Sequence, residues 1–72
     1  MNAKEARALA VEKLIQYCER LIHENAENFQ AKTIITLNSR CDVGVVKDAV
    51  KSLIHRGYKV EEVVGCYLNI EW

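Results

Sequence analysis

The sequence contains no proline, only three glycines and few aromatic residues, and no long apolar run. Half of its 72 residues are nevertheless apolar, which is not the composition of a disordered segment. A membrane span needs roughly 18–20 consecutive apolar residues, and the mixed charges of the opening residues do not suit a secretory signal or a transit peptide. We therefore expect a folded, cytoplasmic protein that does not enter a membrane.

The chain also lacks net charge, because ten basic and ten acidic side chains balance. This balance excludes a strongly basic nucleic-acid coat and an acidic decoy. It hides a local imbalance: residues 31–59 carry six basic and two acidic side chains, and residues 60–72 carry three acidic ones only. A chain of this length is expected to form one domain, residues 1–72, whose small core alone gives thin stability.

Three cysteines are present, Cys18, Cys41 and Cys66, and no two of them have the spacing of a CxxC motif. An odd, widely spaced set fits neither a disulfide framework nor a zinc site, so we expect free thiols in a reducing compartment. Cys41 precedes a predicted helix N-terminus, a position that can activate a thiolate, but the adjacent Asp42 opposes this. A reactive thiol and an inert loop cysteine both stay open for Cys41.

Residues 3 to about 27 have the pattern of a long amphipathic helix that ends among the asparagines of 25–28. Its apolar stripe comprises Val11, Leu14, Ile15, Cys18, Leu21 and Ile22, and Ala8, Asn25 and Phe29 continue it. The next segment, 31–37, is rich in threonine and isoleucine and predicts a strand with Ile34 and Ile35 on opposite faces.

A second helix is predicted over 42–56, with Asp42 as its N-cap. Gly57 stands at the C′ position, where Tyr58 closes a Schellman motif on Leu53. Residues 59–64 and 66–72 then alternate as two strands, with Gly65 at or near the turn.

The element order α-β-α-β-β predicts an α+β fold with two helices on one face of a three-stranded mixed sheet, in strand order 1-3-2. A right-handed crossover through the second helix makes the first two strands parallel, and the third strand fits between them. The alternative is a β-hairpin at the edge of a β-α-β unit.

The first helix is long for its domain: about 37 Å at 1.5 Å per residue, against a compact diameter of about 28 Å. An uncovered apolar stripe marks an interface, so we predict a homo-oligomer, with a dimer as the default. The predicted interface is the stripe itself: Val11, Leu14, Ile15, Cys18, Leu21 and Ile22. Alternatively, residues 1–10 form a solvated extension.

No catalytic or cofactor-binding motif stands out, so we expect no enzyme, no cofactor and no metal site. His23 and His55 fall on polar helix faces, and Glu61 and Glu62 point to opposite faces of a strand, so neither pair forms a catalytic or metal-binding unit.

A basic ridge on the second helix could follow phosphates, which makes a nucleic-acid-binding regulator the alternative function. Its residues are Arg40, Lys47, Lys51 and His55. The competing interpretation is a solvated face, and a winged helix is disfavoured because only one helix precedes the hairpin. Tyr67 marks the second sheet face, which two helices on the other side would leave bare, and such a face suits partner docking.

Residues 39–72 resemble the small phage-encoded accessory proteins with an α-β-α-β-β pattern. The resemblance lies in a capped helix ending in His55-Arg56-Gly57-Tyr58-Lys59-Val60 and a closing strand Leu68-Asn69-Ile70-Glu71-Trp72. It implies a small protein of the host cytoplasm that binds and blocks a host protein or sequesters a small signal molecule.

Overall fold

The computed structural model describes residues 1–37, 41–63 and 67–72. Two helices and three strands follow one another in the order α-β-α-β-β. Their bounds are α1 Ala3–Glu27, β1 Lys32–Thr36, α2 Val43–His55, β2 Lys59–Val63 and β3 Tyr67–Glu71. The predicted elements are confirmed to within one or two residues at each end, and the predicted turn at Gly65 lies outside the described residues.

The three strands form one sheet in the order β1-β3-β2. Because β3 lies between the other two, the predicted 1-3-2 arrangement is confirmed and the edge-hairpin alternative is wrong. Both hydrogen-bonded pairs are antiparallel. The sheet that we expected to be mixed therefore has no parallel pair among its described strands, although β1 and β2 run in the same direction.

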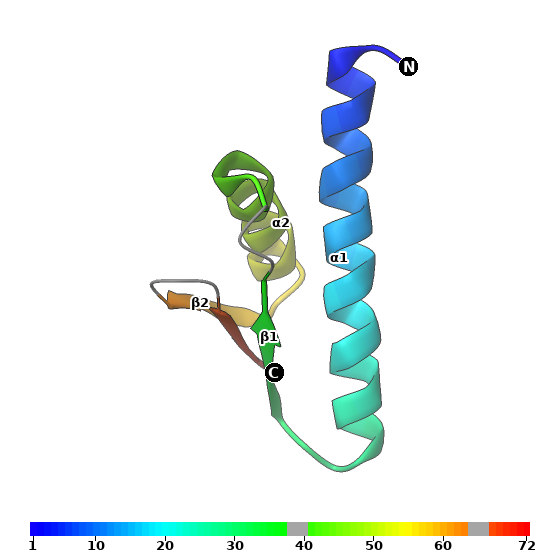
Figure 1. The fold of residues 1–72 in the computed structure, drawn as a ribbon. Helices are drawn as coiled ribbons and strands as arrows, with labels where there is room; N and C mark the ends of the chain where they lie inside the picture. Colours follow the sequence, from blue (N-terminus) through cyan, green and yellow to red (C-terminus); the bar gives the residue numbers. More distant parts are fainter. Residues whose placement is uncertain (38–40, 64–66) are drawn as a thin grey trace.

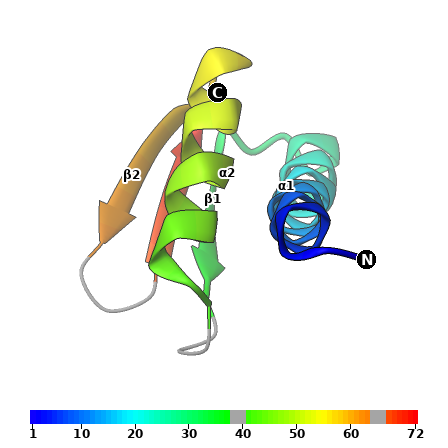
Figure 2. The same ribbon diagram turned by 90° about the horizontal axis from the view of Figure 1, so that it is seen from above.

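Both helices cover the same face of the sheet (Figures 1 and 2). Helix α1 contacts β1 and α2, while α2 contacts β2, so the two helices lie side by side over opposite halves of the sheet. No helix of residues 1–37, 41–63 and 67–72 lies on the other face of the sheet. The molecule measures 41 × 23 × 19 Å, and its longest dimension follows α1.

Side chains cap the beginning of each helix. The Asn2 side chain accepts a hydrogen bond from the Glu5 N–H at 2.8 Å, and Asp42 accepts one from the Val45 N–H at 3.1 Å. These bonds satisfy N–H groups that have no partner within the helix. Asp42 is therefore the N-cap that the sequence predicts.

Both helices end in the same Schellman motif. In α2 the Tyr58 N–H donates to the Leu53 carbonyl and the Gly57 N–H to that of Ile54, as predicted, with Gly57 at φ +98°. In α1 the Gln30 N–H donates to Asn25 and the Phe29 N–H to Ala26. The left-handed C′ position that usually holds glycine is occupied there by Phe29, at φ +62°.

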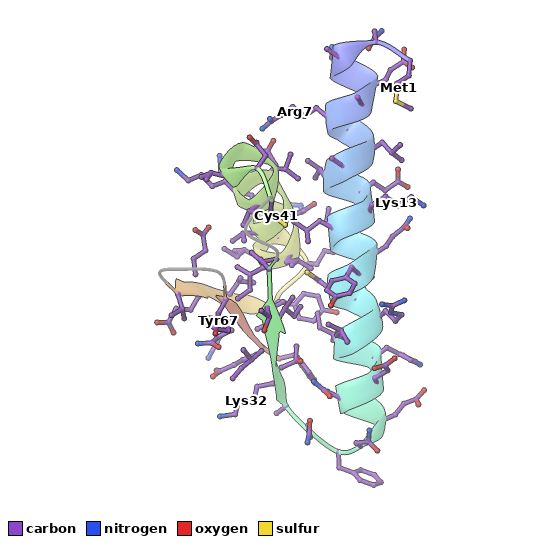
Figure 3. The ribbon with its side chains drawn as sticks, in the orientation of Figure 1. Met1, Arg7, Lys13, Lys32, Cys41 and Tyr67 are labelled. Carbon is purple, nitrogen blue, oxygen red and sulfur yellow. The ribbon has the colours of Figure 1, made fainter. Side chains whose placement is uncertain are left out.

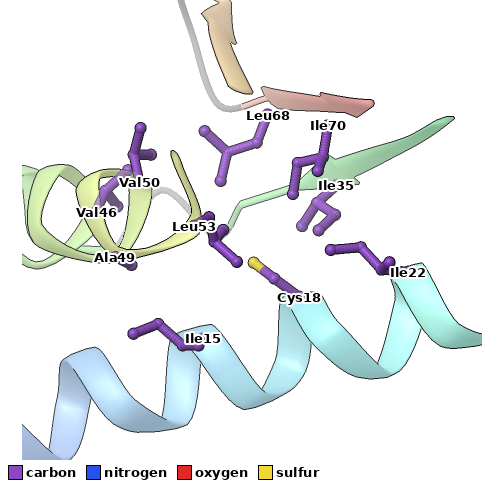
Figure 4. Packing of buried hydrophobic residues seen from close by; sticks show 10 residues of the cluster. All are labelled: Ile15, Cys18, Ile22, Ile35, Val46, Ala49, Val50, Leu53, Leu68 and Ile70. Carbon is purple, nitrogen blue, oxygen red and sulfur yellow. The ribbon is translucent and has the colours of Figure 1, made fainter. Parts of the chain in front are cut away.

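The core draws on both helices and on the helix-covered face of the sheet (Figure 4). It consists of Ile15, Cys18, Ile22, Ile35, Val46, Ala49, Val50, Leu53, Leu68 and Ile70. On β1 and β3 every second residue is buried, which follows from the alternation of side chains across a sheet, whereas on β2 Val60 is half-buried and its neighbours are exposed. Among the described residues, Thr33 is the one polar residue buried beside them.

Ion pairs join α1 to α2 at two levels. The Arg7 guanidinium lies 2.9 Å from the Asp48 carboxylate and 3.7 Å from that of Asp42, and Glu19 pairs with Arg56 further along. The order of these partners shows that the helices run in the same direction, an arrangement whose side-by-side dipoles repel slightly. Such exposed pairs contribute about 0–1 kcal/mol each, so they orient the helices more than they stabilise them.

The amino-terminal part of α1 is the part of this long helix that extends beyond the sheet. All of residues 1–10 are exposed, as the solvated-extension alternative expects. Arg7 nevertheless reaches α2, because Gly44 leaves room for it: a Cβ there would come within 2.8 Å of the guanidinium. Helix α2 thus accompanies α1 beyond the sheet, and only the first turns of α1 project freely.

The neighbouring residues Leu53 and Ile54 offer a matched test of this core. Leu53 is fully buried whereas Ile54 is 51% exposed. We expect Leu53→Ala to lower the free energy of unfolding by about 2–5 kcal/mol, because it removes buried methyl groups and leaves a cavity. Ile54→Ala should change it by less than about 1 kcal/mol. Urea unfolding followed by circular dichroism measures both, and equal effects would contradict the packing described.

Candidate functional site

The sheet face that no described helix covers lies outside the core, and we call it the open face. Register places its side chains in three cross-strand rows. The rows are Lys32–Glu71–Lys59, Ile34–Asn69–Glu61 and Thr36–Tyr67–Val63. Ile34 is 63% exposed and Tyr67 46% exposed. Tyr67 and Lys32 project away from α1 (Figure 3).

Charge and apolar surface are separated along the open face. The first row alternates lysine and glutamate, so that Glu71 lies opposite both Lys32 and Lys59, an arrangement that stabilises a sheet. The last row joins Tyr67 to Val63 and is uncharged. With Glu61 included, the face carries two positive and two negative charges and is neutral overall.

A groove of about 730 Å³ lies at the end of the sheet where β1 and β2 begin and β3 ends. This end groove is lined by Asn25, Gln30, Ala31, Lys32, Thr33, Ile34, Gly57, Lys59, Glu71 and Trp72. Two contacts hold Trp72 in place there. Its backbone N–H donates to the Ala31 carbonyl at 3.0 Å, and its ring lies edge to face with that of Tyr58, with the two ring centres 6.5 Å apart. The lining of the end groove therefore includes both the charged row of the open face and the Trp72 side chain next to it.

The residues predicted as an oligomer interface lie against the core of a single chain. Ile15, Cys18 and Ile22 are buried in it. Val11, Leu14 and Leu21 are half-buried and pack against it. An interface on this stripe stays a prediction, but one that used its buried members would require the chain to open.

The described residues of the basic ridge are exposed on α2, as the sequence predicts. Lys47, Lys51 and His55 are exposed and follow one another at intervals of four residues, on one edge of α2. Among the described residues no ion pair engages them, since Asp48 pairs with Arg7 instead. Arg40 lies outside the described residues.

The cysteines differ in environment. Cys18 is fully buried, and burial raises the pKa of its thiol from 9.0 to about 11, so it stays protonated and inert near neutral pH. Cys41 is half-buried and packs against the core, with a free thiol. Both interpretations of Cys41, a reactive thiol and an inert loop cysteine, stay open, and Cys66 lies outside the described residues.

Two surface features were not predicted from the sequence: the exposed side chain of Phe29 and the charged row on the open face. Phe29 was expected to continue the apolar stripe of α1, but the helix ends at Glu27 and the Phe29 side chain is 100% exposed. The asparagines of 25–28, which predict the end of the helix, were the sequence signal that Phe29 lies beyond it. The charged row on the open face needs the strand register, which the alternation within each strand does not fix.

No known protein family, characterised protein or solved structure matches this chain. The resemblance to small phage-encoded proteins therefore stays an expectation. Within the described residues, no helix has the length and apolarity needed to cross a membrane. The same residues bring together no group of three histidine, cysteine, aspartate or glutamate side chains suited to a metal ion.

The Cys18 thiol gives a pH-dependent test of the core. Its pKa is about 11 in the folded chain against an ordinary value of 9.0, so the unfolded chain loses its proton first. Its contribution to the free energy of unfolding is complete below pH 9.0 and is lost as the pH rises to about 11. We expect the stability advantage of the wild type over Cys18→Ala to shrink across that range in urea unfolding. A difference in the free energy of unfolding between the two proteins that stays constant over this pH range would contradict the raised pKa of Cys18.

Proposed function

We propose that this protein is a non-enzymatic interaction module that binds another protein through the open face of its sheet. The observation that supports the proposal is the combination of Ile34, Tyr67 and Val63, all exposed, with a polar and charged surround on a rigid sheet. An apolar patch containing an aromatic residue and bordered by polar groups is the usual anatomy of a protein interface.

The charges of the open face favour a protein partner over a nucleic acid. A nucleic-acid surface needs excess positive charge to follow phosphates. Here Glu71 and Glu61 offset Lys32 and Lys59, and Tyr67 alone is aromatic among the nine residues of the three rows. A polypeptide that places apolar side chains over Tyr67 and acidic ones over the lysines suits the surface better.

The same charges make the open face a poor match for itself. Two copies packed about a two-fold axis along β3 would place Lys32 against Lys59. An axis across the strands would instead place Glu61 against Glu61 of the other copy. Both arrangements oppose like charges, which is costly in an interface. The partner we propose is therefore a different protein, which agrees with the expectation of a host target.

The experiment compares capture of host proteins by three forms of the immobilised chain. We expect Tyr67→Thr with Val63→Thr to lose the partner that the wild type retains, because threonine keeps the strand but removes the apolar surface. The control is Tyr17→Ala, which removes an exposed aromatic residue from α1. Mass spectrometry identifies the captured proteins. An unchanged set after the sheet substitutions would reject the open face as the docking surface.

Nucleic-acid binding through α2 is the second candidate function. The observation that favours it is the exposed row of Lys47, Lys51 and His55, whose side chains take part in no ion pair among the described residues. The row is short, so it would give weak contacts with two or three phosphates.

We expect such binding to fall with salt at a slope of about −2 to −3 in log K against log salt, and to disappear in Lys47→Glu with Lys51→Glu. The matched control is Lys4→Glu with Lys13→Glu, which makes the same change of charge on α1. Fluorescence anisotropy with labelled DNA and RNA gives the measurement. Equal binding by the two double variants, or none by the wild type at low salt, would reject this function.

A further inference from the structure

Phe29 combines two unfavourable features at one position. Its backbone is left-handed, at φ +62°, where a bulky side chain is strained and glycine is favoured. Its side chain is 100% exposed, so the ring gains no burial in return. The other Schellman motif of the protein, at the end of α2, has Gly57 at the same position. The left-handed backbone closes the Schellman motif, but the aromatic ring adds nothing to the fold, which points to a role for the ring outside it.

The backbone that carries this strained aromatic residue is fixed by hydrogen bonds. The Gln30 N–H bonds to the Asn25 carbonyl at 2.9 Å and the Phe29 N–H to that of Ala26 at 3.1 Å. These bonds fix the turn between α1 and β1, which forms one end of the molecule (Figure 1). A large side chain on a fixed backbone loses little entropy on binding, which is the property of an interface anchor.

The end groove begins directly beside this anchor. Gln30 and Ala31, the next two residues, belong to its lining, and Trp72 and Ile34 add apolar surface. A cavity of about 150 Å³ already accepts a benzene ring, so a groove of about 730 Å³ has room for a phenylalanine side chain. The Phe29 side chain is fully exposed, so it does not fill the groove of its own chain, and a second copy can supply the ring.

Charge also matches a second copy. The last turn of α1, next to Phe29, carries Glu24 and Glu27 at the negative end of the helix dipole, and Glu27 is paired with His23 of the preceding turn at 2.6 Å. The groove carries Lys32 and Lys59 on either side of Glu71. An acidic anchor region and a groove with excess positive charge attract each other.

We propose that the chain forms a two-fold symmetric dimer in which Phe29 of each copy inserts into the end groove of the other. An anchor that lies at the rim of its own groove suits this symmetry, because one two-fold axis between the two satisfies both contacts together. The proposal goes beyond the partner-docking function, since its occupant is a second copy and its anchor is not on the open face. It also replaces the α1 stripe as the site of self-association.

The experiment uses the purified chain and its single tryptophan. Sedimentation equilibrium from about 10 µM to about 1 mM should show a monomer–dimer equilibrium, since a small contact gives weak association. Emission of Trp72, which lines the groove, should shift to shorter wavelength over the same concentrations. Phe29→Gly should weaken the dimer at least about tenfold and abolish the emission shift. It should also raise the Tm of the monomer by about 4 °C, because glycine relieves the left-handed strain.

Further variants distinguish this dimer from one that forms through a different surface of the chain. Phe29→Asn tolerates the left-handed position and should likewise lose the dimer. Tyr17→Ala, on the outer face of α1, and Tyr67→Thr, on the open face, should both retain it. A wild type that stays monomeric throughout overturns the proposal. So does a Phe29→Gly chain that dimerises like the wild type, or a dimer lost in Tyr17→Ala instead. None of these results depends on whether the open face binds a partner.

Discussion

Cys18 of α1, Leu53 of α2 and Ile70 of β3 meet without any exposed surface in a core that lies on one side of the sheet only. With 72 residues there is apolar surface for one such layer and no more. Both helices lie on the same face of the sheet, where their apolar stripes are buried together with side chains of β1 and β3. The one-sided core thus decides the shape of the molecule, its helix arrangement and the existence of an open face.

The surfaces proposed for binding follow from this constraint. The open face exists because no helix is left to cover it, and its Ile34 and Tyr67 are exposed by the same alternation that buries Ile35 and Leu68. The end groove exists because the α1–β1 turn must carry the chain from the end of a long helix back to the sheet edge. Phe29 lies in that turn, so the anchor and the groove arise from one connection.

The apolar stripe of α1 illustrates how one sequence pattern serves two interpretations. Its length exceeds the sheet, and from the sequence alone the surplus pointed to a second chain. The structure instead extends α2 alongside α1, where Arg7 pairs with Asp48 at 2.9 Å, and buries Ile15, Cys18 and Ile22 internally. Helical periodicity shows that one face of a helix is apolar, but it does not show which element packs against that face.

Local chemistry in the sequence determined where the elements begin and end. Asp42 and Gly57 mark the two ends of α2, and the alternation around Leu68 and Ile70 marks a half-buried strand. The order α-β-α-β-β with its chain reversal then left few ways to arrange the sheet, so the fold could be predicted. The strand register was decided only by the tertiary structure. Register depends on pairing between distant segments, which the spacing of apolar residues within each strand does not encode.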